Sequence, residues 1–330
     1  MADQPILMLV DMVADRFLSG RPKRISREAP VLILSYEDET MTPGGGANAV
    51  ANVAALGGQP LPIGLVGDDE SGRLLIEVLE NAGIPATGIH QRSGYRTPTK
   101  TRILGGGHHS IKQQIVRFDI EEKRDLSPAE EEIIGKQLEQ WRGRAKVAVL
   151  SDYGYGAVPP SLVERVREVV GPDGTILCDS RYRLAEFAGL DGATPNEEEA
   201  EALLGSSIPD SLEDLATTGP RLLKLLGAQF LLITRGSHGM NLFDLEGCCQ
   251  IPVHGTDQVA DVTGAGDTVI GTFALALAAG ATPLESALLA NYAGGIVVMK
   301  RGTATLSRRE LELAVTSNPR PLADLQWAKY

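Results

Sequence analysis

The chain has 330 residues, of which 43% are hydrophobic and 5% aromatic. This length suits one large α/β domain or two small ones. The formal net charge of −12 disfavours non-specific binding to nucleic acid or to an anionic membrane surface. The three cysteines form neither a disulfide framework nor a CxxC motif, and neither a signal peptide nor a membrane-spanning apolar run is evident. We therefore expect a cytoplasmic protein with reduced thiols.

Strand and helix patterns alternate from the N-terminus onward. Residues 6–10 (ILMLV) predict a buried strand that ends at Asp11, and residues 42–58 predict a glycine loop followed by an alanine-rich helix. Residues 61–69 predict a strand and turn, and residues 70–84 predict an amphipathic helix. Repeated units of this kind indicate an α/β fold with a mostly parallel sheet and helices on both faces.

Two segments break this alternation. Residues 11–40 contain a long extended stretch, and residues 97–119 contain two alternating strands around GGGHHS (105–110), which predicts a hairpin. We expect both segments to form a small β-sheet lid inserted into one domain that spans residues 1–320. Residues 321–330 are expected to form a separate tail.

The alternation of strands and helices resumes after the lid segments and continues to the end of the domain. The predicted strands are residues 146–154, 174–180, 228–240 (with a glycine turn) and 247–254. The predicted helices are residues 160–170, 196–205 and, approximately, 266–280, 284–299 and 307–315.

A glycine turn at residues 261–268 (DVTGAGDT) opens one of these helices. Gly264 and Gly266 permit a tight turn, and the free N–H groups and dipole of a helix N-terminus attract anions. Asp267 lies in the first turn, where it either caps the helix or accepts a proton from a hydroxyl that attacks a phosphoryl group. A dinucleotide-binding GxGxxG motif is excluded because Val269 stands where its third glycine would be, and no Walker loop occurs.

Together with residues 43–57 (PGGGANAVANVAALG), this turn resembles the two glycine signatures of the ribokinase-like, PfkB-type carbohydrate kinases. The resemblance covers roughly residues 5–315 and implies an ATP-dependent kinase whose phosphoryl acceptor is an alcohol group. By this similarity Asp267 is the catalytic base. The anion hole for the transferred phosphoryl group is then formed by the backbone of Gly264, Ala265 and Gly266.

The resemblance also implies ATP, Mg²⁺ and, in many members, a monovalent cation such as K⁺. Asn196 and Glu199 would organise Mg²⁺, although Asn196 also suits the N-cap of an acidic helix. Asp261 and Thr263 would bind the monovalent cation, or Asp261 simply caps the turn. Backbone groups near Val297 and Gly302 would complete that cation site. Contacts to the nucleotide are expected from Thr234, Gly236 and Asn291.

The sugar is expected to bind between the lid and the main domain. Asp15 aligns with the family's aspartate that binds sugar hydroxyls, and a carboxylate can accept two hydroxyl donors at once. Gly44, Gly45 and Asn48 would contact the sugar from the other side, although Asn48 also suits a helix N-cap.

Residues 11–34, 98–121 and 150–158 look like the corresponding segments of D-glycero-D-manno-heptose 7-phosphate kinases. An acceptor that already carries a phosphate requires cations in its pocket, and the arginine guanidinium matches phosphate oxygens. We assign Arg102 to this role and expect two or three arginines at most to contact the substrate. The arginines available in the lid segments are Arg16, Arg24, Arg27, Arg102 and Arg117.

The resemblance to this branch is incomplete: Val10 stands where a glycine is expected before Asp11, and the GGGHHS hairpin is longer than expected. Tyr155 replaces the lysine of a DYxKG segment, and DSRY (179–182) replaces DPKG, which leaves Arg181 in place of a second lysine. The implied reaction is phosphorylation of the heptose 7-phosphate to a 1,7-bisphosphate. The alternatives are another PfkB-type kinase that acts on a ketose phosphate or nucleoside, and a non-catalytic sugar-phosphate sensor. We also expect a homodimer through the lid, because exposed sheet edges and faces pair readily.

Overall fold

The computed structural model describes residues 1–107, 112–255, 259–320 and 325–330. Within these residues, ten strands form a main sheet in the order β14-β13-β12-β11-β10-β9-β8-β1-β4-β5. Neighbours from β11 to β5 run parallel, whereas the pairs from β11 to β14 run antiparallel, so the predicted mostly parallel sheet is confirmed. The strands are β1 (Pro5–Val10), β4 (Gln59–Gly67), β5 (Ile89–Arg92), β8 (Val147–Asp152), β9 (Thr175–Ser180), β10 (Gly192–Ala193), β11 (Phe230–Thr234), β12 (Met240–Phe243), β13 (Gly247–Ile251) and β14 (Gln326–Lys329).

The central strand β1 shows why both faces of the sheet are covered. Its side chains alternate between two separate hydrophobic cores: Met8 packs into one core, and Leu7 and Leu9 pack into the other. Helices α1 (Gly46–Ala55), α2 (Glu70–Asn81), α7 (Ala265–Ala278), α8 (Pro283–Val297) and α9 (Arg308–Ser317) contribute to the first core. Helices α3 (Pro128–Glu139), α4 (Val163–Val170), α5 (Glu197–Leu204) and α6 (Leu212–Leu226) contribute to the second. Short 3₁₀ turns lie at Pro160–Leu162, Leu184–Glu186 and Gly236–His238.

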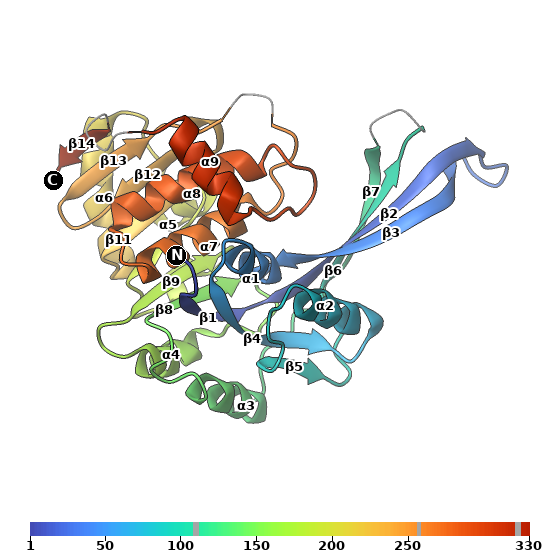
Figure 1. The fold of residues 1–330 in the computed structure, drawn as a ribbon, viewed down its shortest axis with the longest axis horizontal. Coiled ribbons are helices and arrows are strands. Elements are labelled where there is room, and N and C mark those ends of the chain that lie inside the picture. Colours follow the sequence, from blue (N-terminus) through green and yellow to red (C-terminus); the bar gives the residue numbers. More distant parts are fainter. Residues whose placement is uncertain (108–111, 256–258, 321–324) are drawn as a thin grey trace.

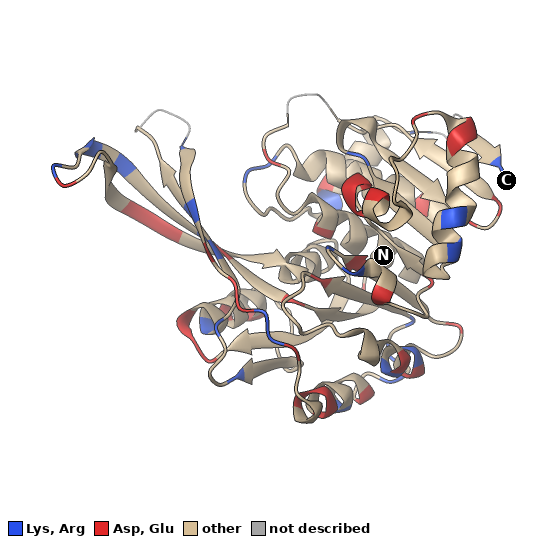
Figure 2. Cartoon of the chain, turned by 180° about the vertical axis from the view of Figure 1, so that it is seen from behind, with Lys and Arg blue, Asp and Glu red and all other residues tan. Residues whose placement is uncertain are grey.

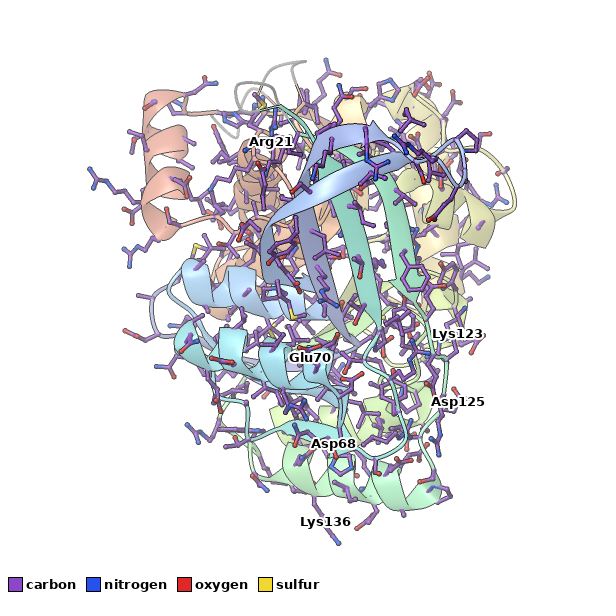
Figure 3. All side chains as sticks on the ribbon, turned by 90° about the vertical axis from the view of Figure 1, so that its right-hand side faces the viewer. Arg21, Asp68, Glu70, Lys123, Asp125 and Lys136 are labelled. Carbon is purple, nitrogen blue, oxygen red and sulfur yellow. The ribbon has the colours of Figure 1, made fainter. Side chains whose placement is uncertain are left out.

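The described chain contains a second sheet, in the order β3-β2-β6-β7, that projects from the main body as a long arm (Figure 1). We call it the lid sheet; its strands are β2 (Met12–Ile25), β3 (Leu32–Gly45), β6 (Thr99–Gly105) and β7 (Gln113–Ile120). Figure 3 faces this arm and shows the four strands side by side in front of the main body. The predicted inserted sheet is confirmed, with β2 and β6 parallel and the other neighbours antiparallel.

The hairpin predicted at residues 105–110 falls partly outside the described residues, which omit 108–111. The strands on either side, β6 and β7, pair in antiparallel register, with Thr99 opposite Ile120 and Gly105 opposite Gln113.

Residues 326–329 correct the prediction of a separate C-terminal tail. They form β14, which pairs with β13 from Gly247 opposite Lys329 to Gln250 opposite Gln326. Trp327 and Ala328 pack against opposite cores of the sheet. The sequence prediction was wrong here because a short strand at a sheet edge is stabilised by its distant partner rather than by its own pattern.

None of the helices in the described ranges combines the length and the apolar run that crossing a bilayer requires.

Candidate active site

Helix α7 begins at the glycine turn that the sequence singled out. Gly264 is its N-cap and adopts the left-handed conformation with φ of 78°, which a residue with a Cβ rarely adopts. No side chain in the described chain caps this helix end. The Ala265 N–H already donates to the Val262 carbonyl at 3.2 Å, whereas those of Gly266 and Asp267 remain available to an external anion. The backbone at this turn therefore has the geometry that an anion-binding role requires.

Asp267 lies in this first turn and is 2% exposed. Its Oδ1 accepts a hydrogen bond of 2.7 Å from the Tyr153 hydroxyl, and its Oδ2 accepts one of 3.1 Å from Asn48 Nδ2. The carboxylate therefore does not cap α7, and this alternative is wrong. Asn48 lies inside α1, whose N-cap is Gly45, so the N-cap interpretation of Asn48 is wrong as well.

Burial raises the pKa of Asp267 to about 7, although the hydrogen bonds from Tyr153 and Asn48 oppose this effect. The negative charge of Asp15 raises the pKa further, and the positive charge of Lys100 lowers it. A carboxyl group with a pKa near the working pH can accept a proton and later release it. The electrostatics of Asp267 thus suit an acid–base group.

Tyr153 was not predicted, and its position depends on a second buried carboxylate. Asp11, immediately after β1, accepts backbone N–H bonds from Tyr153 (2.8 Å), Tyr155 (3.0 Å) and Ala157 (3.0 Å). Burial raises the pKa of Asp11 to about 6. These bonds fix the loop after β8 and aim the Tyr153 hydroxyl at Asp267. The signal in the sequence was a polar residue at the carboxyl end of each of two buried parallel strands.

We expect kcat/KM for the acceptor to rise with pH through about 7 and to level off above it, because only deprotonated Asp267 accepts a proton. Tyr153→Phe removes a hydrogen bond that favours the charged form of Asp267, so the pKa of Asp267 should rise. The rising part of the pH–rate profile should then move to higher pH, while the kcat/KM at the plateau stays within a few-fold of the wild-type value. A pH–rate profile of both proteins measures this shift. A uniform loss of activity with an unmoved limb would show that Tyr153 has only a structural role.

The expected sugar-binding residues converge beside Asp267, at the base of the lid sheet. Asp15 Oδ1 forms an ion pair of 2.6 Å with Arg102 Nη1, and Asp15 Oδ2 accepts a bond of 2.9 Å from the Thr303 hydroxyl. A Cβ at Gly44 would lie 2.7 Å from the Asp15 carboxyl carbon, so only glycine fits. Gly45 has φ of 50° and ends β3 just before α1.

A cavity of about 430 Å³, here called the transfer cavity, joins these groups to the glycine turn. Its lining includes Asp15, Gly45, Lys100, Arg102, Arg117, Asp152, Tyr153, Asp179, Arg181, Thr194, Asn196, Glu199, Thr234, Thr303 and residues 262–267. The predicted catalytic residues, Asp15, and the Asn196–Glu199 pair thus face one space.

A neighbouring apolar cavity of about 420 Å³ lies between β11 and helices α7 and α8. Its lining includes the three residues that the sequence predicted to contact a nucleotide, Thr234, Gly236 and Asn291. The side-chain Oδ1 of Asn291 is buried and lacks a hydrogen-bond partner in the described chain, so a donor from a ligand would satisfy it. Residues shared with the transfer cavity connect the two spaces; they are Thr234, Val262, Ala265 and Gly266.

The sequence left open whether Asn196 and Glu199 cap a helix or face a ligand site, and in the structure they do both. Asn196 Oδ1 accepts from the Glu199 N–H and Glu199 Oε2 accepts from the Asn196 N–H, each at 2.9 Å, so the pair caps α5. Both residues also line the transfer cavity, near Asp179. Burial raises the pKa of Glu199 and holds the pKa of Asp179 well above its usual range.

This donor set fits Mg²⁺ held largely by a ligand's phosphates. No group of three or more His, Cys, Asp or Glu residues in the described ranges could hold a metal by itself. Mg²⁺ commonly uses one or two protein carboxylates together with substrate phosphates and water. Glu199 and Asp179 can provide those carboxylates.

The turn at Asp261 is already satisfied by the protein. Asp261 Oδ1 accepts from the Thr263 N–H at 2.9 Å, and Oδ2 accepts from the Gly302 N–H at 3.0 Å. The N–H groups of residues 260 and 261 both donate to the Val298 carbonyl. The segments near residues 297 and 302, which were expected to complete a cation site, lie against this turn. The turn-capping interpretation of Asp261 is confirmed.

The structure separates the predicted lid arginines into two groups. Arg102 and Arg117 line the transfer cavity. Arg16 instead pairs with Glu39, and Arg24 and Arg27 are exposed outside this cavity. Figure 2 shows both signs of charge along the lid arm. Lys100, a second cation on β6 in this cavity, was not predicted.

This fold and site define the class of the chain. The family model described as pfkB family carbohydrate kinase matches residues 10–310, so the chain belongs to this family and is an ATP-dependent carbohydrate kinase.

Within this family, the chain is similar to proteins of one particular kind. The bifunctional protein HldE of Mesorhizobium japonicum is 36% identical over 323 residues, which cover 96% of this chain and 63% of that protein. HldE of Halorhodospira halophila is 38% identical over 327 residues, which cover 97% of this chain and 65% of that protein. The chain thus spans less than two thirds of the length of these relatives.

Solved structures share the fold at lower identity. Phosphofructokinase-2 from Escherichia coli, in complex with substrates and products, matches with a TM-score of 0.75 and 18% identity, covering 96% of this chain and all of that one. Ribokinase from Arabidopsis thaliana, complexed with ribose and ATP, matches with a TM-score of 0.71 and 21% identity, covering 96% of this chain and 99% of that one.

Proposed function

We propose that the chain transfers the γ-phosphoryl group of ATP to the anomeric hydroxyl of D-glycero-β-D-manno-heptose 7-phosphate, which yields the 1,7-bisphosphate and ADP. The observation that carries this proposal is the buried Asp267 carboxyl, with a pKa raised to about 7, beside the uncapped start of α7. The junction of the apolar and transfer cavities at this turn supports the binding of two ligands in line. The resemblance of residues 11–34 and 98–121 to heptose 7-phosphate kinases supports this acceptor.

In the proposed reaction Asp267 orients the acceptor hydroxyl and takes its proton as the oxygen attacks the γ-phosphorus. The bond between that phosphorus and the β–γ bridging oxygen breaks, and ADP leaves with the bond's electron pair. The N–H groups of Gly266 and Asp267 bind the charge that collects on the transferred phosphoryl oxygens. Asn48 and Tyr153 hold the carboxylate in position throughout.

Each substrate has its own set of residues in this proposal. Asp15 and the backbone at Gly44 and Gly45 orient the sugar hydroxyls, whereas Asn291 meets the adenosine moiety in the apolar cavity. Thr234, which lines both cavities, and Gly236, which lines the apolar one, contact the nucleotide. Bound Mg²⁺ would neutralise the phosphates beside Glu199 and Asp179, with Asn196 in reach. Each oxygen of the Asp261 carboxylate accepts one backbone N–H bond and keeps a further lone pair, so we assign Asp261 and Thr263, with nearby carbonyls, to a K⁺ ion.

A turnover screen tests the proposal. Purified protein with ATP and Mg²⁺ is assayed for ADP release on phosphorylated heptoses, ketose phosphates and nucleosides, with and without K⁺, and products are identified by ³¹P NMR. We expect the highest kcat/KM with the heptose 7-phosphate and a new anomeric phosphate signal. A higher kcat/KM for a ketose phosphate or nucleoside would reassign the acceptor, and no ADP release on any acceptor would favour a sensor.

We also propose that the lid pairs with a second copy in the cytoplasm, where ATP is available. Large apolar side chains are exposed on its strands: Phe118 is 63% exposed, Val116 49% and Ile115 45%. Exposed apolar patches of this kind mark interaction surfaces. Sedimentation should show a dimer that Phe118→Asp dissociates; a monomeric wild type would contradict this assignment.

A further inference from the structure

We infer that Asn52 of α1 is a positioning residue for phosphoryl transfer, because it holds the Asn48 amide with an N–H group toward the Asp267 carboxylate. This inference rests on the proposed kinase reaction and deepens it. Asn52 lines neither the transfer cavity nor the apolar cavity, so it acts through its neighbour rather than on a ligand.

The two asparagines are unusual residues for their place in the fold. Helix α1 otherwise consists of glycine, alanine and valine, and Asn48 and Asn52 are 1% and 0% exposed, respectively. Asparagine is a weak helix former, and a buried amide is unfavourable unless its polar atoms are hydrogen-bonded. The two residues lie one helical turn apart, so their side chains share a face. This arrangement indicates a hydrogen-bond network rather than simple packing.

Hydrogen bonds connect this pair to the proposed catalytic carboxylate. The backbone N–H of Leu306 donates to Asn52 Oδ1 at 3.2 Å, and Asn52 Nδ2 donates to Asn48 Oδ1 at 3.1 Å. Asn48 Nδ2 then donates to Asp267 Oδ2 at 3.1 Å and to the Gly264 carbonyl at 3.3 Å. Asn52 Nδ2 also donates to the Asn48 backbone carbonyl at 3.0 Å. Both N–H bonds of each amide therefore have an acceptor within the protein.

The direction of these bonds is set by the backbone group at their start. A backbone N–H can only donate, so Asn52 must present its oxygen to Leu306 and its NH₂ group to Asn48. Asn48 then presents its own oxygen to Asn52 and its NH₂ group to Asp267. An amide that turns over exchanges a donor for an acceptor. Asn52 therefore keeps Asn48 from turning an acceptor toward Asp267.

This restraint matters because Asp267 changes its charge in the proposed reaction. A donor from Asn48 favours the ionised carboxylate, which is the form that accepts the proton. Without Asn52, the Asn48 amide would be free to turn and to accept the O–H of the protonated carboxyl. That bond would stabilise the protonated form and weaken Asp267 as a base.

The Leu306 anchor belongs to the segment that also holds the sugar-side carboxylate. In this segment the Thr303 hydroxyl donates to Asp15 Oδ2 at 2.9 Å. The Leu306 N–H, a few residues later, starts the line of bonds that reaches Asp267 through Asn52. One short segment thus contacts Asp15 directly and Asp267 through the two amides. It can fix the spacing of the two carboxylates that face the acceptor.

The pH dependence of turnover on the heptose 7-phosphate tests this role. Asn52→Leu and Asn52→Ser both remove the donor to the Asn48 side chain. The serine hydroxyl can still bond the backbone carbonyl one turn earlier, so this variant serves if leucine impairs folding. We expect the rising part of the kcat/KM profile to move to higher pH in both variants. At about pH 6, kcat/KM should fall about 3–10-fold more than on the plateau, the effect of one hydrogen bond, with KM for ATP unchanged.

The titratable groups that face Asp267 are the same in the wild type and the variants; they are Tyr153, Asp15, Lys100 and Asp179. Titration of the substrate's phosphate cancels as well, because all proteins are assayed with the same acceptor. A shift of the profile therefore reports the orientation of the amide beside Asp267. The infrared carboxyl band of Asp267, obtained by subtracting the spectrum of Asp267→Asn, follows the same titration without substrate and should move in the same direction.

Thr272→Val is the matched control, because the buried Thr272 hydroxyl on α7 donates to the Thr268 carbonyl of its own helix at 2.7 Å. We expect this control to keep the wild-type pH profile. An unmoved profile and an unmoved carboxyl band in the folded Asn52 variants would overturn the positioning role and leave the kinase reaction intact. If the wild type released no ADP with any acceptor, the proposed function would fail, and the infrared titration would still decide whether Asn52 sets the amide beside Asp267.

Discussion

Asp267→Asn is expected to lower kcat by about 10²–10⁴-fold while ATP still binds, because an amide cannot take the acceptor's proton. The substitution preserves the shape of the side chain and its hydrogen bond from Tyr153. In the variant, however, an amide N–H group faces the Nδ2 donor of Asn48, so the hydrogen bond between these side chains is lost. The Asn48 amide cannot flip to present its oxygen instead, because its Oδ1 already accepts a hydrogen bond of 3.1 Å from Asn52. We therefore also expect a loss of about 1–3 kcal/mol in the free energy of unfolding.

Steady-state turnover, calorimetric titration with ATP and thermal unfolding measure these effects separately. Asp68→Asn is the matched control, since Asp68 is an exposed carboxylate at the β4–α2 turn, labelled in Figure 3. We expect this control to have wild-type turnover. Wild-type kcat in the folded Asp267→Asn variant would exclude Asp267 as the proton acceptor.

Asp15→Ala is expected to cause the second large effect, on both binding and stability. Asp15 would accept hydrogen bonds from the sugar, and charge-assisted bonds contribute about 1.5–3 kcal/mol each, so kcat/KM for the acceptor should fall about 10²-fold. The side chains of Arg102 and Asp15 are only 10% and 3% exposed, respectively. The substitution therefore leaves the Arg102 charge buried without its carboxylate partner. Removal of one partner from such a pair costs about 3–5 kcal/mol of unfolding free energy.

The double variant Asp15→Ala/Arg102→Met separates these two effects. Replacement of both members of a buried ion pair by apolar groups is often close to neutral, so the double variant should regain much of the lost stability. It should not regain activity on the acceptor, whereas KM for ATP should remain at the wild-type value in both proteins. Recovery of acceptor turnover in the double variant would show that Asp15 acts only by neutralising Arg102.

The sequence predicted the fold well wherever local patterns determine structure. The continuous apolar run of residues 6–10 predicted a strand that is buried on both faces, and the 3.6-residue period of segment 70–84 predicted a helix with one buried face. The edge strand β14 was missed, because its formation depends on pairing with β13, some 80 residues earlier in the chain.

The site was predictable to a similar extent. Asp267, Gly264 and Asn196 were identifiable because the glycine turn and the acidic helix start are local motifs. Tyr153 and Thr303 were not, since they meet Asp267 and Asp15 across 114 and 288 residues of chain, respectively. The carboxyl ends of parallel strands gather such side chains at one edge, but a single sequence does not specify which of them will touch.

A crystal structure with a non-hydrolysable ATP analogue and the heptose 7-phosphate would test the central claim most directly. The decisive measurement is the distance from the acceptor's anomeric oxygen to the nearer carboxylate oxygen of Asp267. We predict a hydrogen bond of about 2.6–3.2 Å, with the γ-phosphate against the N–H groups of Gly266 and Asp267. A γ-phosphate bound away from this turn, or an acceptor hydroxyl facing a different base, would contradict the account.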